Sequence, residues 1–335
     1  MAIRVAINGF GRIGRMVLRA LYERNEQEIE IVAINDLCPI EDNIHLLKYD
    51  SVHGRFLTSI EQENDYMIIN SDRIKMLSEK DPKNLPWEEF DIDIVFECSG
   101  RFTKREAAHD HVIAGAKHVL ISAPGDGVDL TVVYGVNHTL LNKTHKIISN
   151  ASCTTNCLAP IADVLHKTVG IDVGYMTTIH AYTGDQRLVD TAHSDLRRAR
   201  AACESMIPSS TGAAKAVGLV LPALKGKLDG TAIRVPTSNV SVIDLTFVAQ
   251  KMATPEIINN AMKEASKGYL KGVLDVVDEP LVSKDFNHQS YSSIFDLTQT
   301  QVIDNRFCRV LSWYDNEWGF SNRMLDVAKY WFPND

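Results

Sequence analysis

The stretch that decides the fold is Ile7-Asn8-Gly9-Phe10-Gly11-Arg12-Ile13-Gly14-Arg15, near the start of the chain. It continues the alternating apolar run that begins at Ile3 and leads into a helical pattern of apolar residues over 16–21. A second apolar run covers residues 29–34 and ends at Asn35-Asp36. A strand, a glycine-rich turn, a helix and a second strand in this order predict a βαβ unit with parallel strands.

Each glycine in the turn has a physical role in such a unit. Gly9 makes the tight turn, Gly11 lets a pyrophosphate approach the backbone, and Gly14 lets the helix pack on the strand. Asp36 lies 22 residues after Gly14, where a carboxylate can bind both ribose hydroxyls of NAD and would repel the extra phosphate of NADP. The pattern therefore predicts an NAD site. The competing interpretation is a glycine-rich turn in an unrelated α/β domain.

The rest of the first half continues the parallel-sheet pattern. Near-continuous apolar runs predict buried strands at residues 92–98, 119–122, 130–136 and 146–149, with a helix at 106–114. Asp36 and Ser122 follow the carboxyl ends of predicted strands, where doubly wound sheets bind ligands. We predict an α/β, Rossmann-type domain over residues 1–152, completed by a C-terminal helix at 317–335.

The second half has a different pattern. Residues 153–316 contain long predicted strands with few crossovers, at 172–180, 231–236, 240–248 and 307–314, and predicted helices at 211–225 and 255–268. This predicts an α+β catalytic domain with a mixed or antiparallel sheet. A long, basic loop between His180 and Pro208 is either a solvated surface loop or a loop that lines the active site and contacts a neighbouring subunit.

Composition limits the functions that the chain can have. It has 335 residues, of which 45% are hydrophobic and 23% charged, and a formal net charge of −8. The acidic balance argues against nucleic-acid and membrane-surface binding, and no apolar run approaches the roughly 20 residues of a membrane span. The N-terminus reads as a strand and not as a signal peptide. The six scattered cysteines fit a reducing cytoplasm and no disulfide framework, and their spacing gives no zinc or other metal site.

The two predicted domains meet at Ser149-Asn150-Ala151-Ser152-Cys153-Thr154-Thr155-Asn156-Cys157. An apolar run follows, so Cys153 falls in the first turn of a predicted helix. The free N–H groups and partial positive charge of a helix N-terminus favour a thiolate, which makes Cys153 a candidate nucleophile. Taken alone, the same residue fits a buried structural cysteine equally well.

The chain resembles the phosphorylating glyceraldehyde-3-phosphate dehydrogenases from Ile3 to Leu325. The motifs that carry the resemblance are Ile7 to Arg15, Ala151 to Cys157, His180-Ala181-Tyr182-Thr183, Ser210-Thr211-Gly212-Ala213-Ala214-Lys215, Arg234-Val235-Pro236 and Trp313-Tyr314-Asp315-Asn316-Glu317-Trp318-Gly319. Membership would imply a homotetramer, with the basic loop at Arg187–Arg200 as a candidate subunit contact. Membership would imply oxidation and phosphorylation of glyceraldehyde 3-phosphate to 1,3-bisphosphoglycerate with NAD and inorganic phosphate.

The resemblance also implies roles for individual residues. Cys153 would attack the aldehyde to give a thiohemiacetal, which becomes a thioester that phosphate cleaves. His180 would be the base and, as an imidazolium, would stabilise the thiolate. Thr183 and Arg234 would bind the substrate phosphate, with Arg198 as a further candidate. The attacking phosphate would contact Ser152, Thr154, Thr211 and Gly212. The NAD site would include Gly9, Gly11, Arg12, Ile13, Gly14, Asp36, Lys80, Ser122 and Asn316.

Two departures from the family pattern leave alternatives open. Thr191-Ala192 replaces a Leu-Pro pair that helps NAD-specific members to exclude NADP, although Asp36 still favours NAD. The segments Asp285-Phe286-Asn287-His288 and Thr298-Gln299-Thr300-Gln301 are more similar to erythrose-4-phosphate dehydrogenase, which hydrolyses its thioester. A third alternative, a non-catalytic NAD-binding scaffold, would need neither Cys153 nor His180.

Overall fold

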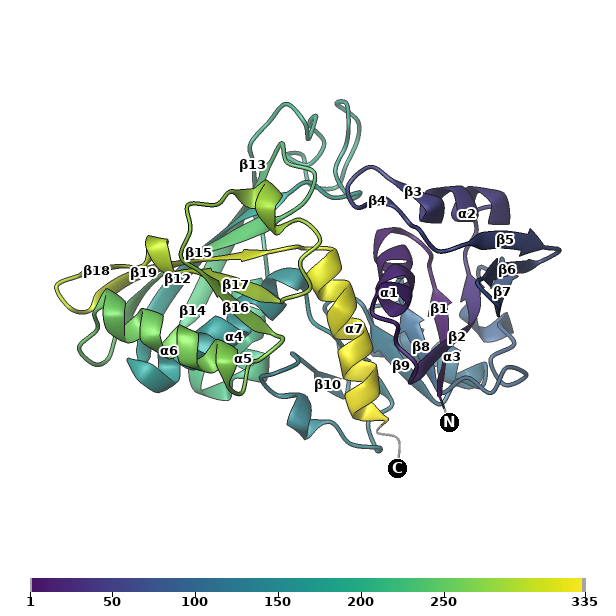
Figure 1. Cartoon of the computed structure of the whole chain (residues 1–335), viewed down its shortest axis with the longest axis horizontal. Coiled ribbons are helices and arrows are strands. Elements are labelled where there is room, and N and C mark those ends of the chain that lie inside the picture. The colour runs from purple at the N-terminus through teal and green to yellow at the C-terminus, as the bar shows by residue number, and fades with distance from the viewer. Residues whose placement is uncertain (1, 333–335) are drawn as a thin grey trace. The chain divides into compact units, whose positions relative to one another are not determined.

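The computed structural model describes residues 2–332, and the chain divides into two compact units (Figure 1). The first unit comprises Met1–Val132, His138–Ser152 and Ser321–Asp335. The second comprises Val133–Asn137 and Cys153–Phe320. None of the described helices is both long enough and apolar enough to cross a membrane.

The first unit is built on a nine-stranded sheet in the order β10-β11-β9-β8-β1-β2-β7-β6-β5. From β10 to β7 all neighbouring strands are parallel, which confirms the predicted doubly wound sheet, whereas β7, β6 and β5 form an antiparallel extension at one edge. Its strands are β1 (Ile3–Asn8), β2 (Ile29–Asn35), β5 (Ile60–Glu63), β6 (Tyr66–Ile69), β7 (Asp72–Leu77), β8 (Ile94–Glu97), β9 (His118–Ile121), β10 (Leu130–Thr131) and β11 (Ile147–Ser149). A separate hairpin pairs β3 (Tyr49–Asp50) with β4 (Gly54–Arg55).

The predicted strand at residues 130–136 is mostly wrong, because only Leu130 and Thr131 pair with β11. The N–H of Val133 instead donates to the Asn137 side chain at 2.8 Å, and the N–H of Val136 donates to the carbonyl of Val133 at 3.1 Å. These local bonds curl the backbone into a turn and end the strand.

Helices α1 (Arg12–Glu23), α2 (Ile40–Lys48) and α3 (Arg105–Ile113) belong to the first unit. The core-facing side chains of β1, among them Val5 and Ile7, are fully buried. Helix α7 (Trp318–Trp331, yellow in Figure 1) begins in the second unit and belongs to the first from Ser321 onward. There the α7 residues Asp326 and Lys329 pair with Arg24 and Glu26, at 2.7 and 3.0 Å.

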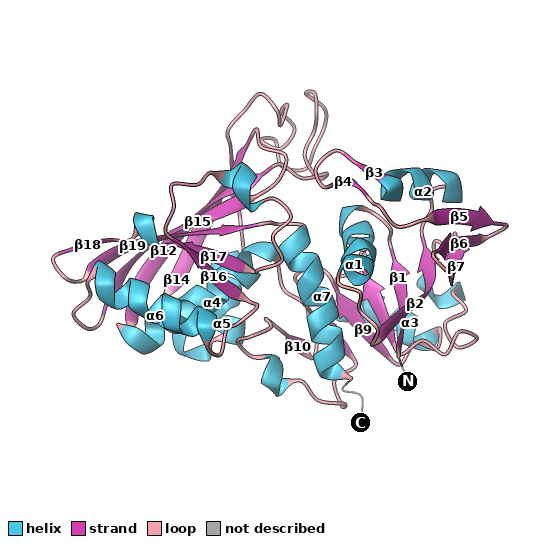
Figure 2. Ribbon diagram, viewed as in Figure 1, coloured by secondary structure: helices cyan, strands magenta, loops and turns pink. Residues whose placement is uncertain are grey.

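The second unit contains a mixed sheet in the order β13-β14-β12-β15-β19-β17-β16, with β18 paired to β19. The pairs β12–β14 and β16–β17 are parallel and the others antiparallel, as expected for a mixed sheet. The strands are β12 (Ile171–Ala181), β13 (Ile207–Ser210), β14 (Leu228–Val235), β15 (Ser241–Ala249), β16 (Leu274–Val277), β17 (Ser293–Asp296), β18 (Gln301–Ile303) and β19 (Phe307–Tyr314). Helices α4 (Cys153–Thr168), α5 (Ala213–Val220) and α6 (Pro255–Lys267) lie along this sheet (Figure 2).

The predicted helix at residues 211–225 is shorter than expected. Helix α5 ends at Val220, and a 3₁₀ turn at Pro222–Leu224 follows it. Proline disfavours the helical conformation in the residue before it, and Leu221 accordingly has φ −126° and ψ 83°.

Candidate active site

Cys153 is the first residue of α4, immediately after the turn that follows β11. That turn places Ala151 in the left-handed region at φ 56°, which an L-residue other than glycine adopts at a cost. The N–H of Ala151 donates to the Ser149 hydroxyl at 3.0 Å and helps to hold the turn. The first-turn N–H groups of a helix have no partner within it, so the thiol of Cys153 lies where a negative charge is favoured.

His180 comes from a distant part of the chain, near the end of β12. Its Nε2 lies 3.5 Å from the Sγ of Cys153. The side chain is only 5% exposed, and its ring meets the ring of Tyr314 edge-on at 5.9 Å. The structure therefore places the candidate base in hydrogen-bond contact with the candidate nucleophile, a proximity that sequence separation cannot show.

Arg234 is the third member of this cluster. It is the register partner of His180 in the parallel pair β12–β14, so its side chain emerges beside the histidine. Its Nη1 lies 2.7 Å from His180 Nδ1 and donates to the Ala181 carbonyl at 2.9 Å. Its Nε is buried and has no hydrogen-bond partner among residues 2–332. A guanidinium held this way is suited to an anionic ligand.

Burial and the arginine charge set the electrostatics of the cluster. Burial raises the pKa of Cys153, opposed first by the positive charge of Arg234 and then by hydrogen bonds at Thr154. Burial and then the Arg234 charge lower the pKa of His180 to about 3, opposed by the hydrogen bond to the Ala181 carbonyl. Burial thus opposes the charged form of both partners of the expected thiolate–imidazolium pair, whereas the Arg234 charge favours the thiolate and opposes the imidazolium.

Tyr314 is a site residue that sequence reasoning missed, although it lies within a quoted motif. Its hydroxyl contacts the Thr154 hydroxyl at 2.9 Å and the Thr178 hydroxyl at 2.8 Å. Thr154 follows Cys153 on α4 and Thr178 precedes His180 by two residues on β12, so the buried tyrosine links the elements that carry the nucleophile and the base. A lone buried tyrosine in an apolar strand gives no sequence signal for this bridge.

The other predicted phosphate ligands lie in several segments of the second unit, apart from Ser152, which ends a segment of the first unit. Thr183 lies just after β12, and its N–H donates to Gln186 at 3.3 Å. Arg198 lies in the long loop and is held by Asp185 at 2.7 Å and Ser209 at 2.8 Å. Gly212 is the N-cap of α5, and Thr211 accepts a hydrogen bond from the Ala213 N–H at 3.2 Å. Ser152 precedes α4 directly.

The glycine turn of the first unit fits a dinucleotide. A Cβ on Gly9, which has φ 91°, would lie 2.5 Å from the Ser99 backbone, and one on Gly14 would lie 2.3 Å from the Gly9 carbonyl. A Cβ on Gly11 would meet nothing within 4 Å. The first and third glycines are therefore needed by the fold, while the second faces open space, as expected where a pyrophosphate approaches.

Asp36 is oriented by the same turn. Its Oδ2 accepts the N–H of Phe10 at 2.7 Å and its Oδ1 accepts the N–H of Cys38 at 2.9 Å. Arg12, the first residue of α1, pairs with the buried Asp50. Burial would raise the pKa of Asp50, but hydrogen bonds from Arg12 and from the N–H groups of His53 and Val52 hold it at about 2. The N–H groups of Phe10 and Cys38 therefore fix the Asp36 carboxylate at the end of β2 and leave it lone pairs for ribose hydroxyls.

The remaining predicted cofactor residues lie in both units. Ile13 belongs to the first turn of α1, exposed Lys80 follows β7, and Ser122 follows β9. Asn316 belongs to the second unit, where it accepts a hydrogen bond from the Ser241 hydroxyl at 2.8 Å.

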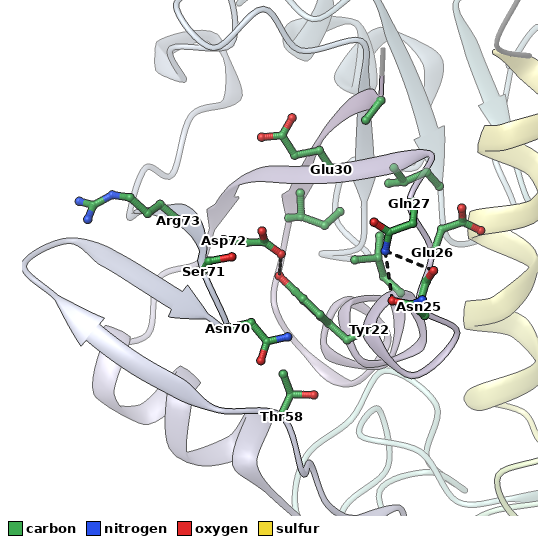
Figure 3. A pocket seen from close by; sticks show the side chains of 14 residues that line it. Tyr22, Asn25, Glu26, Gln27, Glu30, Thr58, Asn70, Ser71, Asp72 and Arg73 are labelled. Carbon is green, nitrogen blue, oxygen red and sulfur yellow. Dashed lines mark hydrogen bonds between the residues drawn. The ribbon is translucent and has the colours of Figure 1, made fainter.

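A separate hollow of about 580 Å³ lies beside the starts of β1 and β2, and Figure 3 shows the side chains that line it. It is lined by residues at the starts of β1 and β2, among them Ala2 and Ile29, whereas Gly9 and Asp36 follow the ends of the same strands. Its carboxylates have partners, since Asp72 accepts from the Tyr22 hydroxyl at 2.9 Å and Glu26 pairs with Lys329. The hollow is therefore distinct from the predicted cofactor site, which lies at the opposite ends of these strands.

Comparisons with known proteins agree with this geometry. Residues 3–105 match the family described as glyceraldehyde 3-phosphate dehydrogenase, NAD binding domain, and residues 152–316 match its C-terminal domain. The chain is 60% identical over 328 residues to a protein from Xanthobacter flavus and 58% identical over 328 residues to one from Cereibacter sphaeroides. It is 55% identical over 331 residues to a protein from Geobacillus stearothermophilus. All three are named glyceraldehyde-3-phosphate dehydrogenase, and each alignment covers 98% of both chains. The chain belongs to the glyceraldehyde-3-phosphate dehydrogenase family.

Proposed function

We propose that the chain is an NAD-dependent enzyme that oxidises and phosphorylates glyceraldehyde 3-phosphate to 1,3-bisphosphoglycerate. The observation that carries this proposal is the cluster of Cys153, His180 and Arg234, with Sγ 3.5 Å from Nε2 and a guanidinium beside the imidazole. The first unit holds the cofactor through its glycine turn and Asp36, and the second unit carries the chemistry.

The residues of the cluster divide the reaction between them. Cys153 attacks the aldehyde carbon, and its thiol proton passes to Nε2 of His180. The backbone N–H of Cys153, at the start of α4, donates to the oxygen of the thiohemiacetal. The imidazolium returns the thiol proton to the thiohemiacetal oxygen. His180 then removes it again as the hydride leaves, and NAD, when bound, would accept that hydride. The product on Cys153 is a thioester, and an oxygen of inorganic phosphate attacks its carbon and releases the thiolate with the acyl phosphate.

Two anion sites serve the phosphates. Arg234 and Thr183 bind the substrate phosphate, with Arg198 of the long loop as a further candidate. The buried Nε of Arg234 has no partner in the described part of the chain and so offers the phosphate a donor. The attacking phosphate contacts the start of α5 at Thr211 and Gly212, together with Ser152 and Thr154. Because the Thr154 hydroxyl is bonded to Tyr314, Thr154 contributes its main-chain N–H.

The segments that are similar to erythrose-4-phosphate dehydrogenase have structural roles. Asp285 accepts the N–H of Val282 at 2.9 Å, and His288 stacks on Trp318 at 3.8 Å. The hydroxyls of Thr298 and Thr300 donate to Asp296 and Asn259, both at 2.6 Å. These contacts account for the presence of the side chains without a role in substrate choice. Glyceraldehyde 3-phosphate therefore remains the proposed substrate, and erythrose 4-phosphate is the alternative substrate to test.

The decisive assay mixes the purified chain with NAD, inorganic phosphate and each aldehyde, and follows the absorbance of NADH. We expect phosphate-dependent turnover that favours glyceraldehyde 3-phosphate. Phosphate-independent turnover that favours erythrose 4-phosphate would replace the proposal with the hydrolytic activity. No turnover with either aldehyde would favour the non-catalytic scaffold.

Cofactor preference has its own test. Asp36→Ala removes the carboxylate that would face the extra phosphate of NADP, so we expect the preference for NAD over NADP in kcat/KM to fall about tenfold. An unchanged preference would mean that other residues exclude NADP.

We also propose a homotetramer in the cytoplasm. The second sheet leaves Val173 and Tyr175 of β12 about half exposed in the single chain, and Leu188 and Leu196 of the long loop are 76% and 82% exposed. Exposed apolar surface of this kind is typical of subunit contacts. All six cysteines are free thiols, which fits a reducing compartment. Analytical ultracentrifugation tests the assembly, and a monomer at micromolar concentration would refute it.

A further inference from the structure

Three neighbouring parallel strands of the first sheet end in buried polar side chains. Glu97 is the last residue of β8, Asn8 of β1 and Asn35 of β2, and Asn8 is in register with both of the others. Their exposed fractions are 1%, 3% and 4%. Gly9 and Asp36 follow β1 and β2 directly, so these side chains lie at the edge where a doubly wound sheet binds its ligand.

Glu97 is the centre of a hydrogen-bond network. Its Oε2 accepts the side-chain N–H of Asn8 at 2.6 Å and the Nε2–H of His111 at 2.9 Å. The proton of His111 lies on Nε2 because the Trp87 indole N–H donates to Nδ1. Oε1 of Glu97 accepts the main-chain N–H of Ser99 at 2.8 Å and the Ser99 hydroxyl. An ionised carboxylate has about four acceptor positions, and these donors occupy them.

The network continues from Asn8 to the loop after β7. Oδ1 of Asn8 accepts the side-chain N–H of Asn35 at 2.7 Å. Asn35 also donates to the carbonyl of Glu79 at 2.9 Å and accepts the main-chain N–H of Glu79 at 2.8 Å. These partners fix which end of each amide carries the oxygen. Donors and acceptors therefore follow one another in a single order from His111 to Glu79.

The loops that the network joins are those that form the predicted NAD site in the first unit. A Cβ on Gly9 would lie 2.5 Å from the Ser99 backbone, so the turn after β1 packs closely on the loop after β8. Asp36 directly follows Asn35, and the loop after β7 carries Lys80. A shift in any one of these loops would change the position of a predicted cofactor contact.

We propose that Glu97 is a positioning residue for NAD, which acts through Ser99, Asn8 and Asn35 to hold these loops in the arrangement that binds the cofactor. The inference rests on the NAD site of the proposed function. Glu97 has no need to touch the cofactor, because it orders the loops before the cofactor binds. Loops that are already ordered lose less conformational entropy on binding, so the affinity for NAD is higher.

The test is Glu97→Gln in the full chain. The amide keeps the size of the side chain but replaces one acceptor oxygen with a donor, which must face either the N–H of Ser99 or those of Asn8 and His111. We expect the Kd for NAD, measured by isothermal titration calorimetry, to rise about tenfold. The Kd for ADP-ribose, which lacks the nicotinamide, should rise by the same factor. In the assay with glyceraldehyde 3-phosphate, the KM for NAD should rise more than kcat falls.

Asp93→Asn is the matched control at the other end of β8. Asp93 lies just before this strand and accepts the main-chain N–H of Arg4 and the Nζ of Lys117, both at 2.9 Å. The control loses an acceptor in the same way, so it should lower the free energy of unfolding and leave the Kd for NAD unchanged. A wild-type Kd in Glu97→Gln, or an equal rise in Asp93→Asn, would contradict the proposal, because Glu97 would then have only a structural role.

Hydrogen exchange is a second measurement, and it holds even if Glu97→Gln fails to fold. In the wild type without NAD, we expect the main-chain N–H groups of Ser99 and Glu79 to exchange slowly. In Asn35→Ala, exchange at Glu79 should become faster, while Ser99 stays protected by its bonds to Glu97. Fast exchange at both positions in the free wild type, slowed only by NAD, would mean that the cofactor orders the loops and would overturn the proposal.

Wild-type turnover with NAD and phosphate is measured separately. An active enzyme whose Kd for NAD is unchanged in Glu97→Gln refutes the positioning role alone. A wild type that binds no NAD refutes both the positioning role and the proposed function, so the two failures are distinguishable.

Discussion

Two buried histidines, one in each unit, have opposite surroundings. His111 on α3 is fully buried, accepts the Trp87 indole N–H on Nδ1 at 3.0 Å and faces Glu97 with Nε2 at 2.9 Å. Because an indole only donates, the proton of His111 is fixed on Nε2 and the carboxylate accepts it. His180 on β12 is nearly as buried, but its neighbours are a guanidinium, a carbonyl and a thiol.

Because both rings are buried, it is their hydrogen-bond partners that distinguish the structural histidine from the reactive one. Glu97 also accepts from the Asn8 side chain at 2.6 Å and from the Ser99 N–H at 2.8 Å, so every group in the His111 cluster has a complementary partner. Such a network stabilises one arrangement. In the His180 cluster, one ring nitrogen, Nδ1, faces both a donor (Arg234) and an acceptor (the Ala181 carbonyl) and cannot bond to both. This cluster can therefore respond to a ligand.

Replacing the nucleophile should have the largest effect. Cys153→Ser removes the atom that forms the thioester, so we expect kcat to fall by about 10⁴-fold or more. Steady-state NADH formation checks this. Cys157→Ser, one turn further along α4, is the matched control and should keep most of the activity. Retained activity in Cys153→Ser would mean that another group is the nucleophile.

Removing the base should have the next largest effect. His180→Asn keeps a polar side chain but cannot take the thiol proton at neutral pH, so we expect kcat to fall about 10²–10⁴-fold. The pH dependence of kcat provides a second readout, because the limb due to the histidine should disappear. A loss in KM alone would show that His180 binds substrate and is not the base.

A substitution at His111 should lower the free energy of unfolding and leave kcat nearly unchanged. His111→Leu leaves the Trp87 N–H and one oxygen of Glu97 without this partner, which should cost about 2–4 kcal/mol of unfolding free energy. Urea unfolding measures the loss, and His109→Leu, exposed on the same helix, is the control. If His111→Leu lowered kcat as strongly as His180→Asn does, the contrast between the clusters would be wrong.

Acid should lower the stability of the wild type more than that of His180→Asn. Its pKa is lowered to about 3 in the folded chain from an ordinary 6.5, so the unfolded chain binds a proton that the folded chain refuses between these values. The neutral His180 ring therefore makes its full contribution to the free energy of unfolding above about pH 6.5. This contribution is lost as the pH falls toward 3. At pH 5 we expect the wild type to have lost about 2 kcal/mol more, relative to pH 7, than His180→Asn. Equal losses would contradict the neutral state of the buried ring.

The sequence predicted most of the fold and the identities of the main site residues. The glycine turn and Asp36 are recognisable because their roles depend on local backbone geometry within one βαβ unit. The approach of His180 to Cys153 was available only through family resemblance, because it depends on how β12 packs beside α4. The Tyr314 bridge and the contacts of Arg234 with His180 and the Ala181 carbonyl could not be predicted, since they depend on how distant strands are placed beside one another. Pro222, by contrast, is a helix-terminating signal present in the sequence, which the predicted helix at 211–225 did not take into account.

Formation of a thioester on Cys153 is the central claim, and a single-turnover experiment without phosphate tests it most directly. The chain is mixed with glyceraldehyde 3-phosphate and excess NAD, and NADH is measured together with the mass of the peptide that contains Cys153. We expect one equivalent of NADH per chain and an acyl group on Cys153 that is released rapidly only when phosphate is added. Continued NADH formation without phosphate, or NADH without an acyl group on Cys153, would contradict the account.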